Sequence, residues 1–543
     1  MELKVYTRKP DSANYPAGLA YSIHIASRVG EEDFRPWNKN YGILFAEAQI
    51  RENDTLFTKS LKNPRIFIME DKSYGIAAVR TLEDGTEDLD SREKVLLWKT
   101  NDFITFDSQG LVDPVKSGWA AAQDSIFLEQ NILEKAIEYW NPVYNTEVTV
   151  PETVTISSEE ELDRLRAKVV YSDGSCHWKS VRWDKSGIDF AANGTYEAEG
   201  TVMNQHFPFP VAVGYGDPVV FPWEGKWYYI STNDNTNDIG LYAREADHVE
   251  ELFLENTVEH LILAQDERRE LIQTFWAPEF HVIGDELYIL FAVSGSVWGP
   301  QCHMMKLRKG KSIIDADSWE DPVRVVRADG SFLTQDGITL DMTYLKTSRS
   351  SYVIWSYRKH IGTALDSGSM LYIATVDEKE PWKLSSDPVL LSRPLLGWEN
   401  VAGTINNEGP HSFIKDGTVY LTYSGGSANS YTYVLGLLTA REEDDLLNVS
   451  SWIKRCSPVL SFYSVAGEYG PGHNSFYTNE EGNLMIAYHA ETALDQNVRC
   501  DGIRRVHFRK NGQPDFALSA QEDLDPSLQR VKTQIILTGC HKQ

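Results

Sequence analysis

The segment DPVVFPWEGKWYYIST, residues 217–232, consists of an acidic residue, an apolar strand, a polar turn and a second apolar strand. The same order, with a polar residue at the start, recurs in four later segments, which begin at Glu279, Asp341, Glu408 and His473. The five starting positions are separated by 62, 62, 67 and 65 residues. A near-constant period of this size predicts five β-blades arranged in a ring, which is a five-bladed β-propeller.

Strand patterns dominate the rest of the chain as well. Short runs of Val, Ile, Tyr, Trp and Phe alternate with clusters of Gly, Asp, Asn and Ser, which predicts an all-β protein. Helical patterns are few. Residues 134–140 form one short candidate, and residues 159–167 fit either an amphipathic helix or a strand followed by a turn.

We expect three parts along the chain. Residues 207–543 hold the propeller. Residues 131–206 alternate apolar and polar residues between turn signals, which is typical of a β-sandwich and resembles an immunoglobulin-like module. Residues 1–130 contain KNPRIFIMEDKSYGIAAVRT, a similar copy of the propeller repeat in which Asn63 replaces the acid. Because an amide cannot act as a base, we predict a degenerate, noncatalytic partial propeller there.

Composition limits the classes of partner. The 543 residues are 42% hydrophobic and 11% aromatic, so the chain can bury several cores. The formal net charge is −27 at pH 7. An acidic surface repels phosphate groups, so we expect neither nucleic acid nor an anionic membrane as a partner.

The cysteines and the N-terminus bear on location. An odd number of scattered cysteines indicates reduced thiols rather than a disulfide framework or a zinc site. The five are Cys176, Cys302, Cys456, Cys500 and Cys540. The first residues hold no apolar signal-peptide core. We therefore expect a cytoplasmic protein if Met1 is the natural start, and a secreted one if the chain is a trimmed form of a longer protein.

The ring geometry turns the repeat into a candidate site. The innermost strand of each blade begins near the axis, so equivalent positions of the blades meet at one end of the central channel. These positions hold Asp217, Glu279, Asp341, Glu408 and His473. Four acids and a histidine are thus expected to face one pocket. The alternative, for an acid such as Asp217 before a proline, is an ordinary turn residue.

Several carboxylates around one pocket suit acid/base chemistry on an acetal. Inverting glycosidases place a carboxylic acid and a carboxylate about 6.5–9.5 Å apart, with the attacking water beside the carboxylate. Crowding raises the pKa of at least one acid and keeps it protonated near neutral pH. The many aromatic residues suit a site that stacks on sugar rings.

Five motifs carry a resemblance to a known family. They are GDPVVF, FWAPEFH, LDMTYL, NNEGPHSF and YGPGHNSF. In this order and spacing they closely resemble glycoside hydrolase family 43, over roughly residues 207–530. The resemblance implies a five-bladed propeller that hydrolyses arabinofuranosides or xylosides with inversion of the anomeric centre.

The resemblance also implies a role for each of three acids. Asp217 matches the general base and Glu408 the general acid. Asp341 matches the carboxylate that raises the pKa of the acid and orients it.

Further residues are implied around the sugar. We expect Trp276, Glu279, Trp355 and Arg504 to bind substrate, with Arg505 as the alternative to Arg504 and packing between blades as the alternative for either Trp. His473 resembles an axial histidine that lies near calcium in many members, so a structural Ca²⁺ on the propeller axis is implied. No cofactor is required for the chemistry.

These inferences predict an inverting, exo-acting glycosidase that releases terminal α-L-arabinofuranose from arabinan or arabinoxylan oligosaccharides of the plant cell wall. Two alternatives remain open. A β-xylosidase is one, because the two sugars present similar hydroxyl layouts. A noncatalytic glycan-binding propeller is the other, although the retained acids argue against it.

Overall fold

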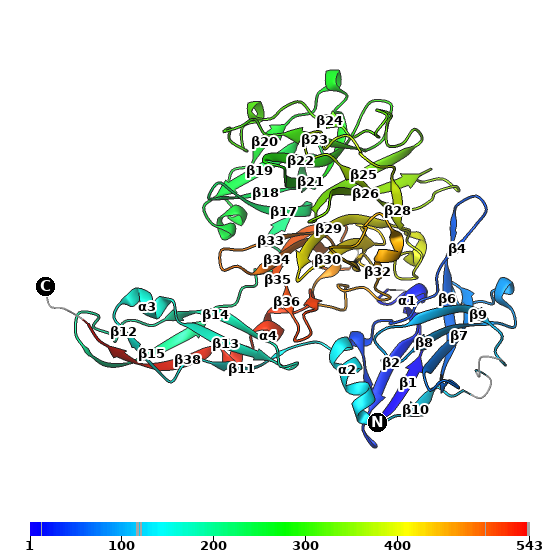
Figure 1. The fold of residues 1–543 in the computed structure, drawn as a ribbon, viewed down its shortest axis with the longest axis horizontal. Coiled ribbons are helices and arrows are strands. Elements are labelled where there is room, and N and C mark those ends of the chain that lie inside the picture. The colour runs from blue at the N-terminus through cyan, green and yellow to red at the C-terminus, as the bar shows by residue number, and fades with distance from the viewer. Residues whose placement is uncertain (12, 116–118, 120–121, 495, 540–543) are drawn as a thin grey trace. The chain divides into compact units, whose positions relative to one another are not determined.

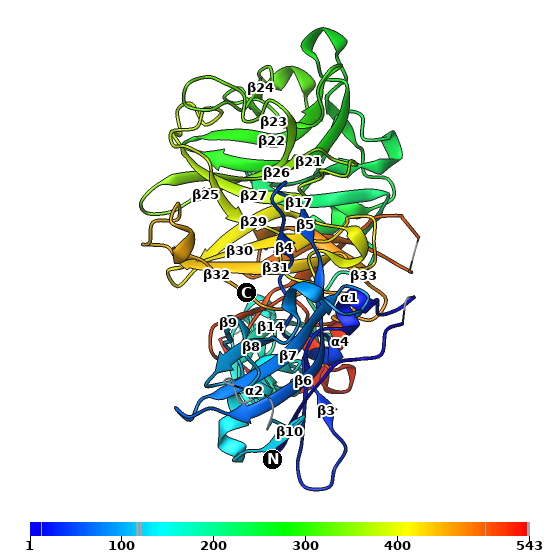
Figure 2. The ribbon, with the colours of Figure 1, turned by 90° about the vertical axis from the view of Figure 1, so that its right-hand side faces the viewer.

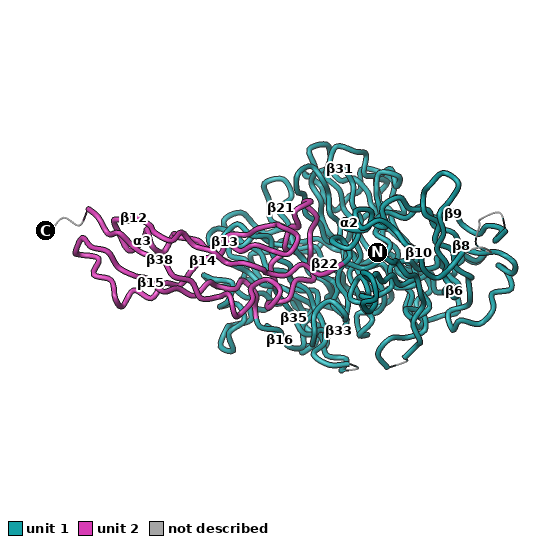
Figure 3. Tube along the Cα trace, turned by 90° about the horizontal axis from the view of Figure 1, so that it is seen from below, with its two compact units in different colours: residues 1–140, 208–503 teal, residues 141–207, 504–543 magenta. Residues whose placement is uncertain are grey.

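The computed structural model describes residues 1–539 apart from residues 12, 116–118, 120, 121 and 495 (Figure 1). These residues are mostly strands, as the all-β prediction requires. The chain divides into two compact units (Figure 3). One unit contains residues 1–140 and 208–503, and the other contains residues 141–207 and 504–543.

A ring of five four-stranded antiparallel sheets forms the propeller, drawn from green to orange in Figure 1. The first three sheets are β17 (Tyr215–Trp223), β18 (Lys226–Asn233), β19 (Leu241–Ala246) and β20 (His260–Leu263); β21 (Gln273–Ile283), β22 (Glu286–Ser294), β23 (Gln301–Lys306) and β24 (Val323–Arg324); and β25 (Gly337–Lys346), β26 (Ser351–Lys359), β27 (Met370–Val376) and β28 (Val389–Ser392). The last two are β29 (Asn407–Lys415), β30 (Thr418–Gly425), β31 (Val434–Arg441) and β32 (Ile453–Lys454); and β33 (Tyr469–Thr478), β34 (Leu484–Glu491), β35 (Cys500–Arg505) and β16 (Ala212–Val213). Each innermost strand contacts the next, and β33 contacts β17, so the ring is closed.

Strand β16 joins the two ends of the ring. It precedes the first blade in the sequence, yet it is the outermost strand of the fifth. Ala212 pairs with Asp501 and Val213 with Cys500. A strand from the start of the propeller therefore covers the edge of its last blade, which leaves no open seam.

Every innermost strand carries the same two-residue bulge near its start. The first residue of each bulge has a left-handed backbone. These residues are Asp217 (φ 59°), Ala277 (φ 45°), Asp341 (φ 54°), Gly409 (φ 55°) and His473 (φ 40°). A left-handed non-glycine residue inside a strand costs about 1–3 kcal/mol, and such residues cluster at functional sites.

The bulges correct the expected equivalence of the five repeat positions. Ala277, not Glu279, occupies the position of Asp217 in the second blade, and Gly409, not Glu408, does so in the fourth. Glu279 lies two residues deeper along its strand, and Glu408 one residue before its bulge. A sequence repeat cannot show this offset, because a bulge changes the facing of a side chain without a gap in the sequence.

Residues 1–140 contain a blade-like copy of the repeat. Figure 2 shows β6 (Lys59–Ile68), β7 (Tyr74–Leu82), β8 (Val95–Thr100) and β9 (Asp107–Val112) side by side in one antiparallel sheet. Strand β6 is bulged between Lys62 and Arg65, and Asn63 there has φ 52°. The local structure therefore matches the inner strands of the propeller, with an amide at the bulge.

The remaining elements of this segment complete its core. They are β1 (Glu2–Tyr6), α1 (Ala17–Ala20), β2 (His24–Arg28), β3 (Arg35–Pro36), the hairpin β4 (Gln49–Ile50) and β5 (Leu56–Phe57), β10 (Ser125–Phe127) and α2 (Gln130–Trp140). Tyr15, Leu19 and Phe45 share an apolar cluster with Trp398 and Leu421 of the propeller. Residues 1–130 are therefore part of the propeller's compact unit, contrary to the expected separate domain.

The second unit corrects the expected C-terminal boundary of the propeller. Its six-stranded sheet contains β11 (Asn145–Thr149), β12 (Thr153–Ile156), β13 (Arg166–Tyr171), β14 (Cys176–Trp183), β15 (Gly194–Val202) and β38 (Arg530–Leu537). Strand β38 pairs with β15 and β12, so residues 504–543 belong with 141–207. The first half of β14 pairs with β13 and its second half with β15, and the sheet folds over a core that includes Val169, Trp183 and Ile535.

The two helical predictions have different outcomes. Residues 134–140 lie in α2, as predicted. Residues 159–167 are divided between the short helix α3 (Glu159–Asp163) and the start of β13. Ser158 caps α3 by accepting a hydrogen bond from the Glu161 N–H.

The cysteines that the structure describes are free thiols, as expected. They are Cys176, Cys302, Cys456 and Cys500. Cys540 lies outside the described residues. Among the described helices, none has the length and apolar character needed to cross a membrane.

The strain at the bulges is testable at Ala277. Ala277→Gly should change the free energy of unfolding by less than about 1 kcal/mol, because glycine adopts the left-handed backbone freely and this offsets the loss of a buried methyl group. Ala374→Gly, in the regular pairing of β27 with β26, should cost about 1–2 kcal/mol because nothing offsets the loss of its buried methyl group. Urea unfolding monitored by tryptophan fluorescence compares the two variants. Equal destabilisation would show that the bulge stores no strain.

Candidate active site

A cavity of about 560 Å³ gathers residues from the bulged ends of the inner strands. Asp217, Asp341, Glu408 and His473 all line it. Its wall also includes Trp276, Arg499, Asp234 and Asp238. The structure therefore brings the three predicted catalytic acids and the predicted axial histidine together.

Asp217 is a buried carboxylate surrounded by donors. Thr232 Oγ1 donates to its Oδ2 at 2.6 Å. Arg499 Nη1 lies 3.1 Å and His473 Nδ1 3.0 Å from its Oδ1. Burial alone would raise the pKa of Asp217, but the charges of His473 and Arg499 hold it well below its usual range. Asp217 is thus ionised and can accept a proton.

Asp341 is held by the backbone of the neighbouring blade. Ser356 Oγ donates to Asp341 Oδ2 at 3.0 Å, and the Gly409 N–H donates to the same oxygen at 3.1 Å. Gly409 is required here, because a Cβ would lie 2.8 Å from the ring of His473. Burial raises the pKa of Asp341 and the charge of Asp217 adds to this, although His473 opposes it.

Glu408 has the properties of a proton donor near neutral pH. Its side chain is buried, and Tyr433 donates a hydrogen bond to its Oε1 at 3.0 Å. Burial and the charge of Asp341 raise the pKa of Glu408 to about 7. Within one cavity, the pKa of Asp217 is therefore lowered and the pKa of Glu408 is raised. This difference is typical of a general base paired with a general acid.

His473 supplies positive charge to this cluster. Burial would lower its pKa, but Asp217 and Asp341 raise it to about 9, so the imidazole is protonated at neutral pH. Calcium binds through six to eight oxygen ligands. The carboxylate oxygen nearest His473 is already shared with Arg499, so a Ca²⁺ beside His473 would have to compete with the guanidinium for it. The Ca²⁺ that the sequence resemblance implies at His473 stays a prediction.

Comparison with known proteins assigns the family. Residues 207–514 match glycosyl hydrolases family 43. The chain belongs to this family. The chain is 30% identical to a protein of Streptomyces avermitilis named extracellular exo-α-(1→5)-L-arabinofuranosidase, over 59% of the chain and 65% of that protein. It is 27% identical to α-L-arabinofuranosidase B of Pyricularia oryzae, over 56% of the chain and 61% of that protein. The chain thus spans less than two thirds of the length of either relative.

A solved structure shares the fold. It is an α-L-arabinofuranosidase from Lactobacillus brevis, 26% identical, with a TM-score of 0.50. The match covers 57% of this chain and 95% of that one. The propeller prediction and the family 43 resemblance are therefore confirmed.

The arginine in the pocket of this family 43 chain is Arg499 rather than Arg504. Arg499 contacts both Asp217 and Asp234. Arg504 lies in the second compact unit, and Arg505 pairs with Asp523 there. One signal could have found Arg499. Gly216 of the GDPVVF motif leaves room for it, since a Cβ at Gly216 would lie 2.3 Å from the guanidinium carbon.

The predicted aromatic residues have opposite outcomes. Trp276 lines the cavity, and its Nε1 donates to Asp238 Oδ2 at 2.9 Å. Trp355 is only 2% exposed, does not line the cavity and packs with Tyr372 in the third blade. The structure therefore does not bring Trp355 together with the three acids, and its contacts match the packing alternative. Glu279 is also outside the cavity, where the bulge offset places it.

Two residues that the sequence analysis missed connect the acid and the base. The Asp217 N–H donates to His489 Nδ1 at 3.1 Å. The His489 ring stacks on Tyr433 at 5.4 Å between centroids, and Tyr433 in turn holds Glu408. Burial lowers the pKa of His489 to about 4, so this imidazole is neutral. His489 lies inside β34 and Tyr433 immediately precedes β31, and the sequence gives no sign of a polar role at either position.

The raised pKa of Glu408 predicts a pH-dependent stability. Its folded-state pKa of about 7 exceeds the usual 4.5, so the folded protein holds the proton more tightly and stability falls between these two pH values. Glu408→Gln removes that loss, of about 3 kcal/mol at most. The melting temperature of the variant, relative to wild type, should therefore rise more at pH 8 than at pH 5.

Thermal melts at the two pH values check this expectation. Glu224→Gln, at an exposed turn, serves as the control and should behave alike at both. A Glu408→Gln effect independent of pH would contradict the assigned protonation.

Proposed function

We propose that this family 43 protein is an inverting, exo-acting α-L-arabinofuranosidase that acts on arabinan or arabinoxylan oligosaccharides of the plant cell wall. One observation carries the proposal: a single cavity holds an ionised Asp217 and a protonatable Glu408, with Asp341 beside them. The names of the relatives from Streptomyces avermitilis and Pyricularia oryzae support the sugar.

Asp217 acts as the general base. It takes a proton from the water that attacks the anomeric carbon. Arg499 and His473 keep it ionised, and Thr232 fixes one of its oxygens. A weak but permanently ionised base is suited to an oxocarbenium-like transition state, in which bond breaking is advanced before the water attacks.

Glu408 acts as the general acid. Tyr433 fixes Oε1, so the carboxyl group has one orientation toward the departing glycosidic oxygen. A pKa of about 7 keeps a large share of this group protonated at neutral pH. When Glu408 gives up its proton, its new negative charge lies near the cationic His473, which limits the cost of that step.

Asp341 is a positioning residue for Glu408. Its hydrogen bond from the Gly409 N–H ties it to the residue that follows the acid. Its proximity raises the pKa of Glu408 by like-charge repulsion. Trp276 presents an aromatic face to the cavity, held in place by Asp238, and suits stacking on a sugar ring.

The names of two relatives bear on the location. The relatives from Streptomyces avermitilis and Streptomyces chartreusis are named extracellular. This supports action outside the cell on wall-derived oligosaccharides. The cytoplasmic alternative stays a prediction.

Leaving-group dependence separates the two catalytic roles. Glu408→Gln and Asp217→Asn should each lower kcat on arabino-oligosaccharides by about 10²–10⁴-fold. A nitrophenyl arabinofuranoside, whose leaving group needs no proton, should restore much of the activity of Glu408→Gln and none of that of Asp217→Asn. Equal losses on both substrates would contradict the roles.

The same assays decide the sugar and the stereochemistry. Faster release from nitrophenyl β-D-xylopyranoside would favour the xylosidase alternative, and tight sugar binding without release would favour a binding protein. NMR of the first-formed anomer distinguishes inversion from retention.

The pH profile tests the acid independently. Because Glu408 must be protonated, kcat/KM should fall above about pH 7, while the acidic limb lies below the usual range of an aspartate. Asp341→Asn removes the charge that raises the pKa of Glu408, so the basic limb should move to lower pH. Stopped assays between pH 4 and 9 measure kcat/KM of the wild type and of Asp341→Asn. Glu224→Gln is the matched control. A basic limb that does not move would assign the raised pKa to burial alone.

A further inference from the structure

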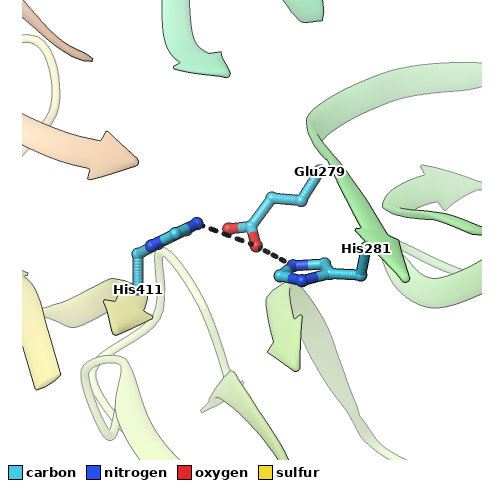
Figure 4. Close-up of side chains that lie close together, drawn as sticks. All are labelled: Glu279, His281 and His411. Atoms are coloured by element: carbon cyan, nitrogen blue, oxygen red, sulfur yellow. Dashed lines mark hydrogen bonds and ion pairs between the residues drawn. The ribbon is translucent and has the colours of Figure 1, made fainter. Parts of the chain in front are cut away.

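A second cluster of ionisable side chains lies deeper in the propeller than the cavity. Glu279 and His281 come from β21, and His411 comes from β29 (Figure 4). Glu279 and His411 are each the first residue to rejoin the ladder after a bulge, paired with Leu290 and Thr422. They are therefore equivalent positions of two blades, one step below the level of the catalytic acids.

The three side chains converge to the spacing of metal ligands. Each offers one ligand atom, and these atoms all lie within 4.8 Å of one another. His281 Nε2 is 2.6 Å and His411 Nε2 3.9 Å from Glu279 Oε2. Ligand distances of about 2.0–2.2 Å on a tetrahedral zinc ion put neighbouring ligand atoms about 3.3 Å apart. The two observed distances lie on either side of this value, and the two histidine ligand atoms lie within 4.8 Å of each other, so small side-chain shifts would form the site.

Glu279 and His281 hydrogen-bond each other, and His411 is the member of this cluster that the described residues leave unsatisfied. Glu279 is 3% exposed and His411 is 9% exposed. Among the described residues, His411 Nδ1 is buried without a hydrogen-bond partner, and its Nε2 is beyond hydrogen-bond distance of Glu279. Leaving a buried polar group unpaired costs about 1–3 kcal/mol.

The donor set indicates the class of metal. Two imidazoles and one carboxylate suit zinc and similar transition metals, whereas calcium and magnesium prefer oxygen ligands alone. Thr343, at the equivalent position of the third blade, lies beside the cluster, with its Oγ1 3.4 Å from His281 Nε2. Its hydroxyl can orient a ligand or a water in a fourth position.

We propose that Glu279, His281 and His411 bind a divalent transition-metal ion, with Zn²⁺ as the best match, on the axis of the propeller. The ion joins the innermost strands of the second and fourth blades across the channel. His411 is three residues beyond Glu408 on β29, so the ion also anchors the strand that carries the acid. This site is separate from His473 and takes no part in the proposed hydrolysis.

Direct binding to the untagged full chain tests the proposal. Protein treated with a chelator and then desalted should bind one equivalent of Zn²⁺ by isothermal titration calorimetry, and Ca²⁺ should bind at least tenfold more weakly. Zn²⁺ should also raise the melting temperature, because an ion that binds only the folded state stabilises it. Absence of Zn²⁺ binding by the wild-type chain, or equal binding of Ca²⁺, would overturn the proposal without any variant.

Substitutions locate the site. His411→Gln and His281→Gln should each weaken Zn²⁺ binding at least tenfold and lose the metal-dependent rise in melting temperature. His248→Gln, at an exposed histidine, is the matched control and should bind as the wild type does. Unchanged binding in the two channel variants would assign the zinc to the surface and refute the site. If a channel variant does not fold, the wild-type stoichiometry and the Zn²⁺ versus Ca²⁺ comparison still decide. All these readouts are independent of glycosidase activity, so failure here and failure of the proposed hydrolysis are separate results.

Discussion

The left-handed residue at the start of each innermost strand is the constraint on which the site depends. It lets the chain approach the axis, turn one side chain or backbone N–H toward the cavity and then resume a regular ladder. Where that residue is Asp217 or Asp341, the turned group is a carboxylate; where it is Gly409, the turned group is an N–H that binds Asp341. The ring then brings residues that are far apart in the sequence within hydrogen-bonding distance.

Charge balance explains why these acids can be buried together. Isolated carboxylates in a low-dielectric interior would all take up protons. Here Arg499 and protonated His473 contact Asp217 directly, whereas Glu408 accepts a hydrogen bond from the neutral hydroxyl of Tyr433 and interacts with His473 through charge without a direct ion pair. The asymmetric placement of two cations therefore separates the pKa values of otherwise similar groups. The stacked rings of His489 and Tyr433 lie between the two acids and hold Asp217 and Glu408 at a fixed separation.

The ring and the positions of three acids could be predicted from the sequence, because a propeller repeats its strand pairs at a visible period. The offset of Glu279 could not, since a bulge leaves no gap in the pattern, and it moved this residue from the cavity to the channel below. Arg499 could not be predicted either, because it lies far from Asp217 in the sequence. The local sign of their interaction is Gly216, whose lack of a side chain leaves room for the guanidinium. Strand β38 was assigned to the propeller because its alternation is the same in any half-buried strand.

The pairing of β38 with β15 has a consequence for how the chain acquires its fold. Strands β11 to β15 are synthesised before the propeller, and the strand that completes their sheet follows it. During translation of the propeller, β15 therefore has no partner on one edge, and the apolar face of the smaller unit is incompletely covered. The ring, closed by Val213 and Cys500, is finished first. Folding of the smaller unit is thus tied to a strand that leaves the ribosome only after the whole propeller.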